Sequence, residues 1–157
     1  MQNIDSFARQ NILIAATNHP ELLDKAIWRR FNTVIEIGLP QEDEIVKLIK
    51  TFTSDFDTEF NGDEKRLDKL AKLFAEKSPS DIKTIINNAK AQTVISDRGE
   101  LQYEDVLIEL FEFNRHGNLT IEKLVEFLNE NGVPQNTIAE RMNVSIRQIR
   151  NYLNKQS

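Results

Sequence analysis

The stretch Asn11–Phe31 reads NILIAATNHPELLDKAIWRRF and sets the first expectation about the fold. It opens with an apolar run, Asn11–Ala16, bounded by polar residues, which is the pattern of a buried strand in a parallel sheet. A proline-containing loop follows, and then the amphipathic segment Glu21–Arg30, for which we expect a short helix. Thr33–Ile37 is again short and rich in β-forming residues. The order strand, helix, strand predicts the end of an α/β domain.

Beyond Gln41 the sequence predicts helices almost throughout. Four groups of apolar residues recur at helical spacing, and each forms a face that needs a partner, so together they predict a small helical bundle. Ser78-Pro79-Ser80-Asp81 has the composition of a helix start, with serine as N-cap, proline at the first position and aspartate in the first turn. The four groups are Ile45, Leu48, Ile49 and Phe52; Leu67, Leu70, Ala71 and Phe74; Ile82, Ile85, Ile86 and Ala89; and Val106, Leu107, Leu110 and Phe111.

Three further helices are expected after a linker at residues 114–119. Thr120 caps the first, Ile121–Asn131, and Gly132 ends it. The other two lie within Gln135–Tyr152, QNTIAERMNVSIRQIRNY, and the segment resembles a helix-turn-helix of the DNA-binding kind. Asn143 stands in the turn where many such motifs have glycine, and asparagine tolerates the left-handed conformation next best.

The helix-turn-helix resemblance assigns a face to the last helix. It implies that Ser145, Ile146, Arg147, Arg150 and Asn151 face the major groove, and that Gln135 and Lys155 contact phosphates. Arginine can pair with guanine and asparagine with adenine, so these residue types suit contact with double-stranded DNA. The alternative is a three-helix packing or partner-binding module that keeps the same geometry without binding DNA.

The opening stretch resembles the second region of homology of AAA-family ATPases, which carries sensor 1 and the arginine fingers. The resemblance places sensor 1 at Asn18, within Ala-Thr-Asn, and arginine fingers at Arg29 and Arg30 before Phe31. In this family the fingers reach the nucleotide of the adjacent protomer in a ring, usually a hexamer. An amide can orient water and a guanidinium can stabilise charge on a transferring phosphoryl group.

Both assignments have a simpler alternative. Asparagine is favoured in turns, so Asn18 can be a polar turn residue before Pro20. Cations are favoured at helix C-termini, and the arginines can form salt bridges with Asp24 or Glu21 on the same helix.

The family also has a four-helix lid after this region, which agrees with the four apolar groups. Its Ser-Gly-x-Asp-Leu signature matches Ser78-Pro79-Ser80-Asp81-Ile82, and the resemblance makes Ser80 and Asp81 candidates for nucleotide contact. Pro79 replaces the glycine of that signature. The resemblance covers roughly residues 1–113.

The sequence has no GxxxxGK[ST] phosphate loop and no apolar strand that ends in paired acids for magnesium. The resemblance therefore implies ATP and Mg²⁺ as cofactors of an intact protein. We expect this chain to be a C-terminal piece of such an ATPase and to be inactive alone.

Composition narrows the remaining possibilities. The chain has no cysteine, and His19 and His116 have no acidic or histidine partner at ligand spacing, so we expect no metal site and favour the cytoplasm. No apolar run approaches the roughly 20 residues of a membrane span, so no membrane partner is expected. Of the net charge of −5, residues 134–157 carry +3, which leaves −8 for the rest and favours two modules with different partners.

The sequence thus predicts a mainly α protein that keeps the remnant of an α/β P-loop sheet. We divide it into the end of the nucleotide-binding domain (residues 1–40), the helical lid (41–113), the linker (114–119) and the helix-turn-helix module (120–157). The favoured hypothesis is an AAA ATPase part coupled to DNA. The alternatives are a stand-alone DNA-binding regulator with an ATPase remnant as scaffold, and a protein-docking module.

Overall fold

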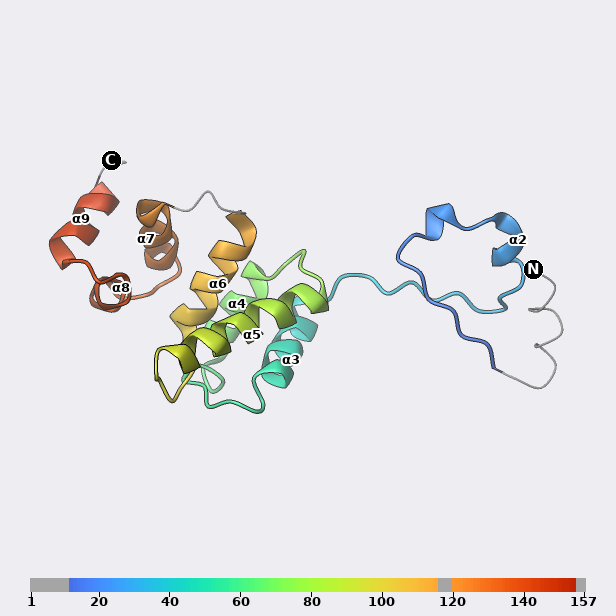
Figure 1. The fold of residues 1–157 in the computed structure, drawn as a ribbon, viewed down its shortest axis with the longest axis horizontal. Helices are drawn as coiled ribbons and strands as arrows, with labels where there is room; N and C mark the ends of the chain where they lie inside the picture. The colour runs from blue at the N-terminus through green and yellow to red at the C-terminus, as the bar shows by residue number, and fades with distance from the viewer. Residues whose placement is uncertain (1–11, 116–119, 155–157) are drawn as a thin grey trace. The chain divides into compact units, whose positions relative to one another are not determined.

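The computed structural model describes residues 12–115 and 120–154. The chain divides into two compact units, one that ends at Gly38 and one that begins at Leu39 (Figure 1). Within the described residues all regular secondary structure is helical, which confirms the prediction of a mainly α fold. In this part of the chain no helix is long and apolar enough to cross a membrane.

The first unit contains two short helices where the sequence predicted one. A 3₁₀ turn, η1 (Pro20–Leu22), and the helix α2 (Lys25–Trp28) are separated by Leu23, whose backbone is extended. The break has a local cause, because the side chain of Asp24 accepts a hydrogen bond from the backbone N–H of Ala26 at 2.9 Å and so starts a new helix.

The two predicted strands are not formed, so this expectation was wrong for the described residues 12–16 and 33–37. Both segments are extended but pair with no neighbour, and their apolar side chains face solvent: Ile12 is 91 % exposed and Ile37 is 90 % exposed. A strand of a parallel sheet needs hydrogen-bonded neighbours and helices on both faces. Within the described residues neither segment has these partners, although its composition is that of a strand.

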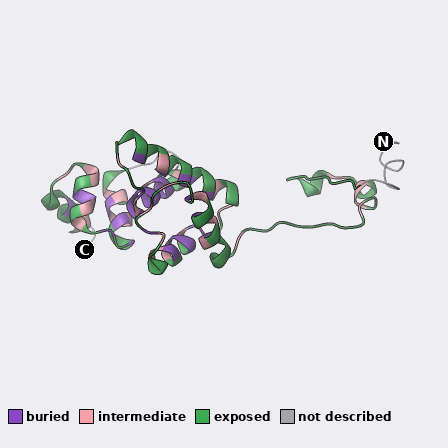
Figure 2. Cartoon of the chain, turned by 90° about the horizontal axis from the view of Figure 1, so that it is seen from below, coloured by how far each residue is buried: buried purple, intermediate pink, exposed green. Residues whose placement is uncertain are grey.

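The second unit begins with the four helices that the apolar groups predicted, namely α3 (Glu42–Phe52), α4 (Glu64–Leu73), α5 (Pro79–Ile95) and α6 (Tyr103–Arg115). α5 packs against α3 and α6, and α3 packs against α4. The buried residues lie on the inner faces of these helices, as Figure 2 shows, and the bundle prediction is confirmed. Most members of the predicted apolar groups are buried in one core: Ile45, Ile49, Leu67, Leu70, Ala71, Phe74, Ile82, Ile85, Ile86, Ala89, Val106, Leu107, Leu110.

The start of α5 is also as predicted. Ser78 is the N-cap and Pro79 occupies the first helical position. The Ser78 hydroxyl accepts from the backbone N–H of Asp81 at 3.1 Å, and the Asp81 carboxylate accepts from the N–H of Ser78 at 3.1 Å. This reciprocal capping box satisfies two backbone donors that a helix start leaves without partners.

Three more helices complete the unit: α7 (Ile121–Glu130), α8 (Gln135–Met142) and α9 (Ile146–Asn154). They pack against one another, and α7 also packs against α6. Their buried residues, such as Val125, Ile138 and Ile149, belong to the same apolar core as those of the first four helices. Of the predicted linker, residues 114 and 115 belong to α6, and residues 116–119 lie outside the described part of the chain.

Two isoleucines of α5 provide a matched test of this core. Ile85 is fully buried, whereas Ile95 is 75 % exposed near the end of the same helix. We expect Ile85→Ala to lower the free energy of unfolding by about 2–5 kcal/mol, because it leaves a cavity in the core. Ile95→Ala should change it by about 0.5 kcal/mol or less. Urea denaturation followed by circular dichroism measures both, and equal losses would contradict the assigned core.

Candidate functional site

The most connected polar group in the second unit is the carboxylate of Asp105, in the first turn of α6. Its side chain is only 4 % exposed. Arg98 donates to both carboxylate oxygens at 2.8 Å, and the backbone N–H of Gln102 donates to Oδ2 at 3.0 Å. A carboxylate at this position is also favoured by the positive end of the helix dipole. The buried charge of Asp105 is therefore compensated.

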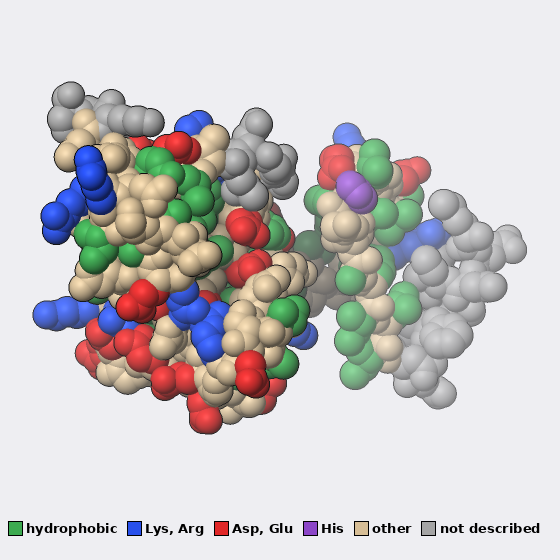
Figure 3. All heavy atoms as spheres, turned by 60° about the vertical axis from the view of Figure 1, so that its left-hand side comes forward, with side chains coloured by type: hydrophobic (Ala, Val, Ile, Leu, Met, Phe, Trp, Pro, Cys, Tyr) green, Lys and Arg blue, Asp and Glu red, His purple; other side chains and the backbone are tan. Residues whose placement is uncertain are grey.

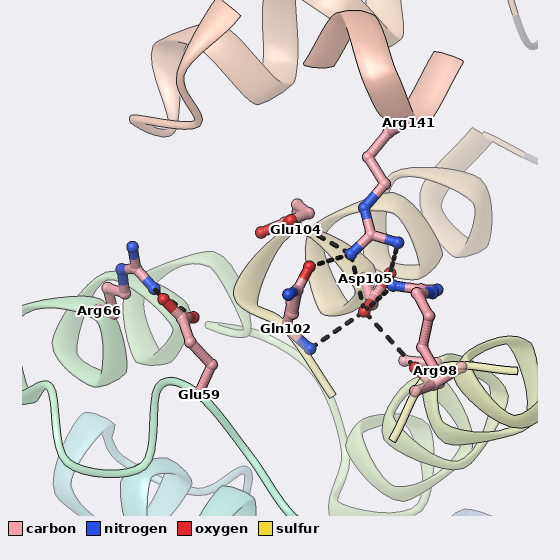
Figure 4. A network of polar contacts seen from close by, with 9 residues as sticks. Glu59, Arg66, Arg98, Gln102, Glu104, Asp105 and Arg141 are labelled. Carbon is pink, nitrogen blue, oxygen red and sulfur yellow. Dashed lines mark hydrogen bonds and ion pairs between the residues drawn. The ribbon is translucent and has the colours of Figure 1, made fainter. Parts of the chain in front are cut away.

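Arg141 reaches this cluster from α8 (Figure 4). Its Nη1 lies 3.3 Å from Oδ1 of Asp105 and its Nη2 lies 3.2 Å from Oε1 of Glu104. Nη2 also donates to the side-chain oxygen of Gln102. The Arg141 side chain is 15 % exposed, so α8 is tied to the first turn of α6 by a largely buried ion pair.

The sequence reasoning missed this cluster. The spacing of Gln102 and Asp105, followed by an apolar group, is a helix-start signal that points to Asp105. Nothing near Arg141 in the sequence indicates a partner that lies 36 residues earlier. In the sequence, Arg141 is one of the basic residues that give residues 134–157 a charge of +3.

Burial raises the pKa of the Glu104 carboxyl above its ordinary value of 4.5. The negative charges of Asp105 and Glu59 act in the same direction, and the positive charge of Arg66 opposes them. Arg66 itself pairs with Glu59 beside the cluster (Figure 4). Each carboxylate of the group thus has an arginine partner, which is an arrangement that suits holding helices together more than holding a ligand.

The C-terminal end of α7 is fixed by two groups from the first four helices. Lys69 donates from Nζ to the carbonyl oxygen of Glu130 at 3.0 Å, and the Tyr103 hydroxyl donates to that of Asn131 at 3.3 Å. The last carbonyls of a helix have no partner within it, and a cation beside them is favoured by the dipole. These bonds and the packing of Phe111 on Phe127, with ring centroids 5.3 Å apart, hold α7 on α6.

The turn between α8 and α9 has the predicted backbone. Asn143 has φ 51° and ψ 44°, so it adopts the left-handed conformation expected of it. The backbone N–H of Val144 then donates to the carbonyl of Ala139 at 3.0 Å and closes the helix end. Ser145 starts α9 as expected: its hydroxyl accepts from the N–H of Gln148 at 3.2 Å, and the Gln148 side chain accepts from the N–H of Ser145 at 2.9 Å.

The side chains assigned to the DNA-facing surface lie mainly on the outside of α9. Ser145, Ile146, Arg147, Arg150 and Asn151 are exposed, whereas Ile149 points into the core. Gln135 begins α8 and is half-buried, and Lys155 lies outside the described residues. The first five are exposed within the single segment Ser145–Asn151, and contact with DNA stays a prediction.

The cations available on this module are fewer than the sequence suggested. Arg141 contributes to the +3 of the C-terminal segment, but its charge is compensated by Glu104 and Asp105. On the face shown in Figure 3, lysine and arginine side chains form separate small groups instead of one continuous patch. Since nonspecific DNA affinity depends on the number of phosphates neutralised, this surface predicts modest electrostatic attraction.

The candidate ATPase residues lie in the first unit. Asn18 follows the extended apolar segment, and Arg29 and Arg30 come directly after α2, all three with exposed side chains. Of the two acids that are alternative partners of the arginines, Asp24 caps α2 and Glu21 lies 3.2 Å from Nδ1 of His19. The sensor and finger roles stay predictions.

The lid signature residues have structural roles. The Asp81 carboxylate caps α5, and the carbonyl oxygen of Ser80 accepts from the Thr84 hydroxyl at 2.9 Å. The Ser80 side chain is exposed and that of Asp81 is half-buried. Nucleotide contact by these two residues is likewise a prediction.

Comparison with known proteins relates the chain to archaeal nucleotidases. It is 30 % identical over 137 residues to the proteasome-activating nucleotidase of Methanothermobacter thermautotrophicus, a match that covers 85 % of this chain and 32 % of that protein. It is 35 % identical over 98 residues to a putative 26S proteasome regulatory subunit homolog of the same organism, covering 60 % of this chain and 25 % of the relative. It is 36 % identical over 97 residues to the proteasome-activating nucleotidase of Methanopyrus kandleri, a match that covers 60 % of this chain and 22 % of that protein.

The chain therefore spans about a third or less of the length of these relatives. No family model matches it, and no solved structure matches it. These similarities support the conclusion that part of the chain is related to the C-terminal region of AAA ATPases. They lend no support to a DNA-binding helix-turn-helix.

The phenol of Tyr103 gives a direct test of the packing between α6 and α7. Burial raises its pKa from 10.0 to about 12. The Tyr152→Phe variant leaves Tyr103 as the single tyrosine, so the phenolate absorbance then reports on it alone. We expect a titration midpoint near 12 while circular dichroism shows the helices intact. The Tyr103 phenol loses its proton at a lower pH in the unfolded chain than in the folded one. The free energy of unfolding should therefore fall as the pH rises from 10 to 12. A midpoint at 10 in the folded protein would show that the phenol is exposed.

Proposed function

We propose that this chain supplies the second region of homology and the helical lid of an AAA-family ATPase. The observation that carries the proposal is the order of its parts: a sensor-like Asn18, paired arginines after α2, and then the four-helix bundle α3–α6. The similarity to archaeal proteasome-activating nucleotidases supports it. In the intact assembly the substrate would be ATP with Mg²⁺, and the protomers would form a ring in which the arginines reach the nucleotide of a neighbour.

The residues of this chain do not fit a complete ATP site, because the sequence has no phosphate loop and no paired acids for the metal ion. They fit the part that acts on a terminal phosphate held elsewhere in the assembly. Asn18 would orient the attacking water, since an amide donates and accepts at once. Arg29 and Arg30 are exposed at the end of α2, where a guanidinium can meet a neighbour's nucleotide and stabilise charge on the phosphoryl group. Ser80 and Asp81, at the start of α5, are proposed as secondary nucleotide contacts.

A chimera tests these roles. The whole chain is fused behind the nucleotide-binding half of the Methanothermobacter proteasome-activating nucleotidase, in place of that protein's own C-terminal region. We expect ATP hydrolysis by the chimera and none by the chain alone. Arg29→Ala with Arg30→Ala should lower kcat by about 10³-fold or more, because arginine fingers contribute that much to phosphoryl transfer.

Lys25→Ala is the matched control, since Lys25 is an exposed cation of the same helix, and turnover should not change. Phosphate release measures the rates, and size-exclusion chromatography shows that each variant assembles. Equal turnover in the arginine variant and in its parent would refute the finger assignment.

A second function is proposed for the last three helices, which is contact with double-stranded DNA through α9. The observation that favours it is the exposed side of α9, where Arg147, Arg150 and Asn151 stand at helical spacing next to Ile146. Such a face presents donors for guanine and adenine and an apolar contact for thymine. The competing proposals are a stand-alone DNA-associated regulator and a module that docks a protein.

Fluorescence anisotropy with a labelled duplex at low salt tests the DNA proposal. We expect binding that weakens in Arg147→Ala with Arg150→Ala by about 1–3 kcal/mol for each arginine removed, because both are proposed to pair with base edges in the major groove. The control variant Lys65→Ala with Lys72→Ala removes two exposed cations from α4 and should bind as the parent does. No binding by the parent chain at low salt would exclude the DNA proposal and leave protein docking.

A further inference from the structure

We infer that Arg141 is a positioning residue that fixes α8, and through it the outer face of α9, to the first turn of α6. Among the described residues, every hydrogen bond and ion pair that joins α8 or α9 to the helices α3–α6 is made by Arg141. The inference requires neither ATP nor DNA, so it stands or falls independently of the proposed functions.

The packing of the helices makes this contact decisive. α7 lies directly on α6 and is held there by Lys69, Tyr103 and the Phe111–Phe127 contact. α8 packs on α7 and α9, so its apolar attachment to α6 is indirect. The guanidinium of Arg141 provides the direct attachment and sets where the far end of α8 lies.

The chemistry of the cluster explains why an arginine is needed. Three acceptors from one turn, on Gln102, Glu104 and Asp105, meet a single guanidinium (Figure 4). The planar fork of arginine can serve several acceptors at once, whereas the ammonium of a lysine is a single point of charge on a shorter reach. The contact is largely buried, so salt screens it only weakly.

The charge balance of the cluster depends on Arg141 as well. Arg98 and Arg141 face the carboxylates of Asp105 and Glu104, with the Arg66–Glu59 pair beside them. Without Arg141 the buried first turn of α6 holds one negative charge in excess, and the side chain that linked it to α8 is gone. The core residues of α8, Ile138 and Ala139, are untouched, so α8 itself can still form.

Amide hydrogen exchange on the full chain, followed peptide by peptide, tests the inference. Arg141→Met keeps the length and apolar stem but removes the charge and its donors. We expect amides of α8 and α9 to exchange roughly tenfold faster or more in this variant, while those of α3–α5 are unchanged, because only the local opening is favoured. Arg141→Lys should restore part of the protection. Lys123→Met removes an exposed cation from α7 and should leave all rates unchanged.

A double-mutant cycle with Glu104→Gln separates positioning from general stability. If Arg141 acts through Glu104, the exchange rates of the double variant change by less than the product of the two single changes. Three results would overturn the inference. The first is that Arg141→Met leaves the amide exchange rates of α8 and α9 within about twofold of the parent's rates. The second is that Arg141→Met accelerates amide exchange equally in all helices from α3 to α9. The third is that Arg141→Met and Glu104→Gln change the exchange rates independently of each other.

Discussion

The burial of α6 is the constraint on which the rest of the second unit depends. It packs against α5 and also against α7, and most of its first nine residues are buried. A helix enclosed in this way must bury charged groups if it carries them, and α6 carries Glu104, Asp105 and Glu109. Burying a carboxylate without a partner is costly, and Arg98 and Arg141 compensate the charges of Asp105 and Glu104. The arginine cluster is the consequence of placing an acidic first turn at the junction of the helices.

This constraint also explains how the lid-like bundle and the last three helices come to share one core. Each is a set of short amphipathic helices with a small apolar surface of its own. The contact of Phe111 with Phe127 joins the two surfaces, and Val125 and Leu128 extend the core of α3–α6 into α7–α9. The polar contacts of Lys69, Tyr103 and Arg141 also join the two sets of helices, and that of Arg141 is largely buried and therefore only weakly screened by salt.

The features that the sequence predicted correctly are those with local causes. A helix makes its backbone hydrogen bonds within itself, so apolar periodicity and a capping sequence such as Ser78-Pro79-Ser80-Asp81 are enough to locate α5. Asn143 is similar, because the left-handed turn depends on its own side chain and its two neighbouring helices. The break at Leu23 also has a local cause, the N-cap Asp24, but the prediction from the sequence was one continuous helix there.

The other features that the sequence analysis predicted wrongly, or missed, depend on partners far away in the chain. The segments at residues 12–16 and 33–37 have the composition of strands, but strands take their hydrogen bonds from neighbours, and composition does not say whether neighbours exist. The pairing of Arg141 with Asp105 also has no local signal in the sequence. It joins α8 to α6 and reduces the number of cations available for contact with DNA. Counting charges along the sequence includes Arg141 in the +3 of residues 134–157, whereas its charge is compensated within the protein by Asp105 and Glu104.

Among the described residues, the cations on the outer face of α9 are Arg147 and Arg150. Two cations give a weak electrostatic attraction to DNA, so a single module would hold a duplex poorly. The proposed ring alters this expectation, because several copies attached to one assembly bind with an effective concentration set by their spacing. Such avidity requires that the copies present α9 in the same orientation. A module fixed to α6 by a buried arginine meets that requirement, whereas one joined only by a flexible segment would lose much of the gain to the entropy of ordering. The weak attraction of a single α9 face to DNA is therefore compatible with DNA binding by the proposed ring, provided that Arg141 holds each α9 in the same orientation.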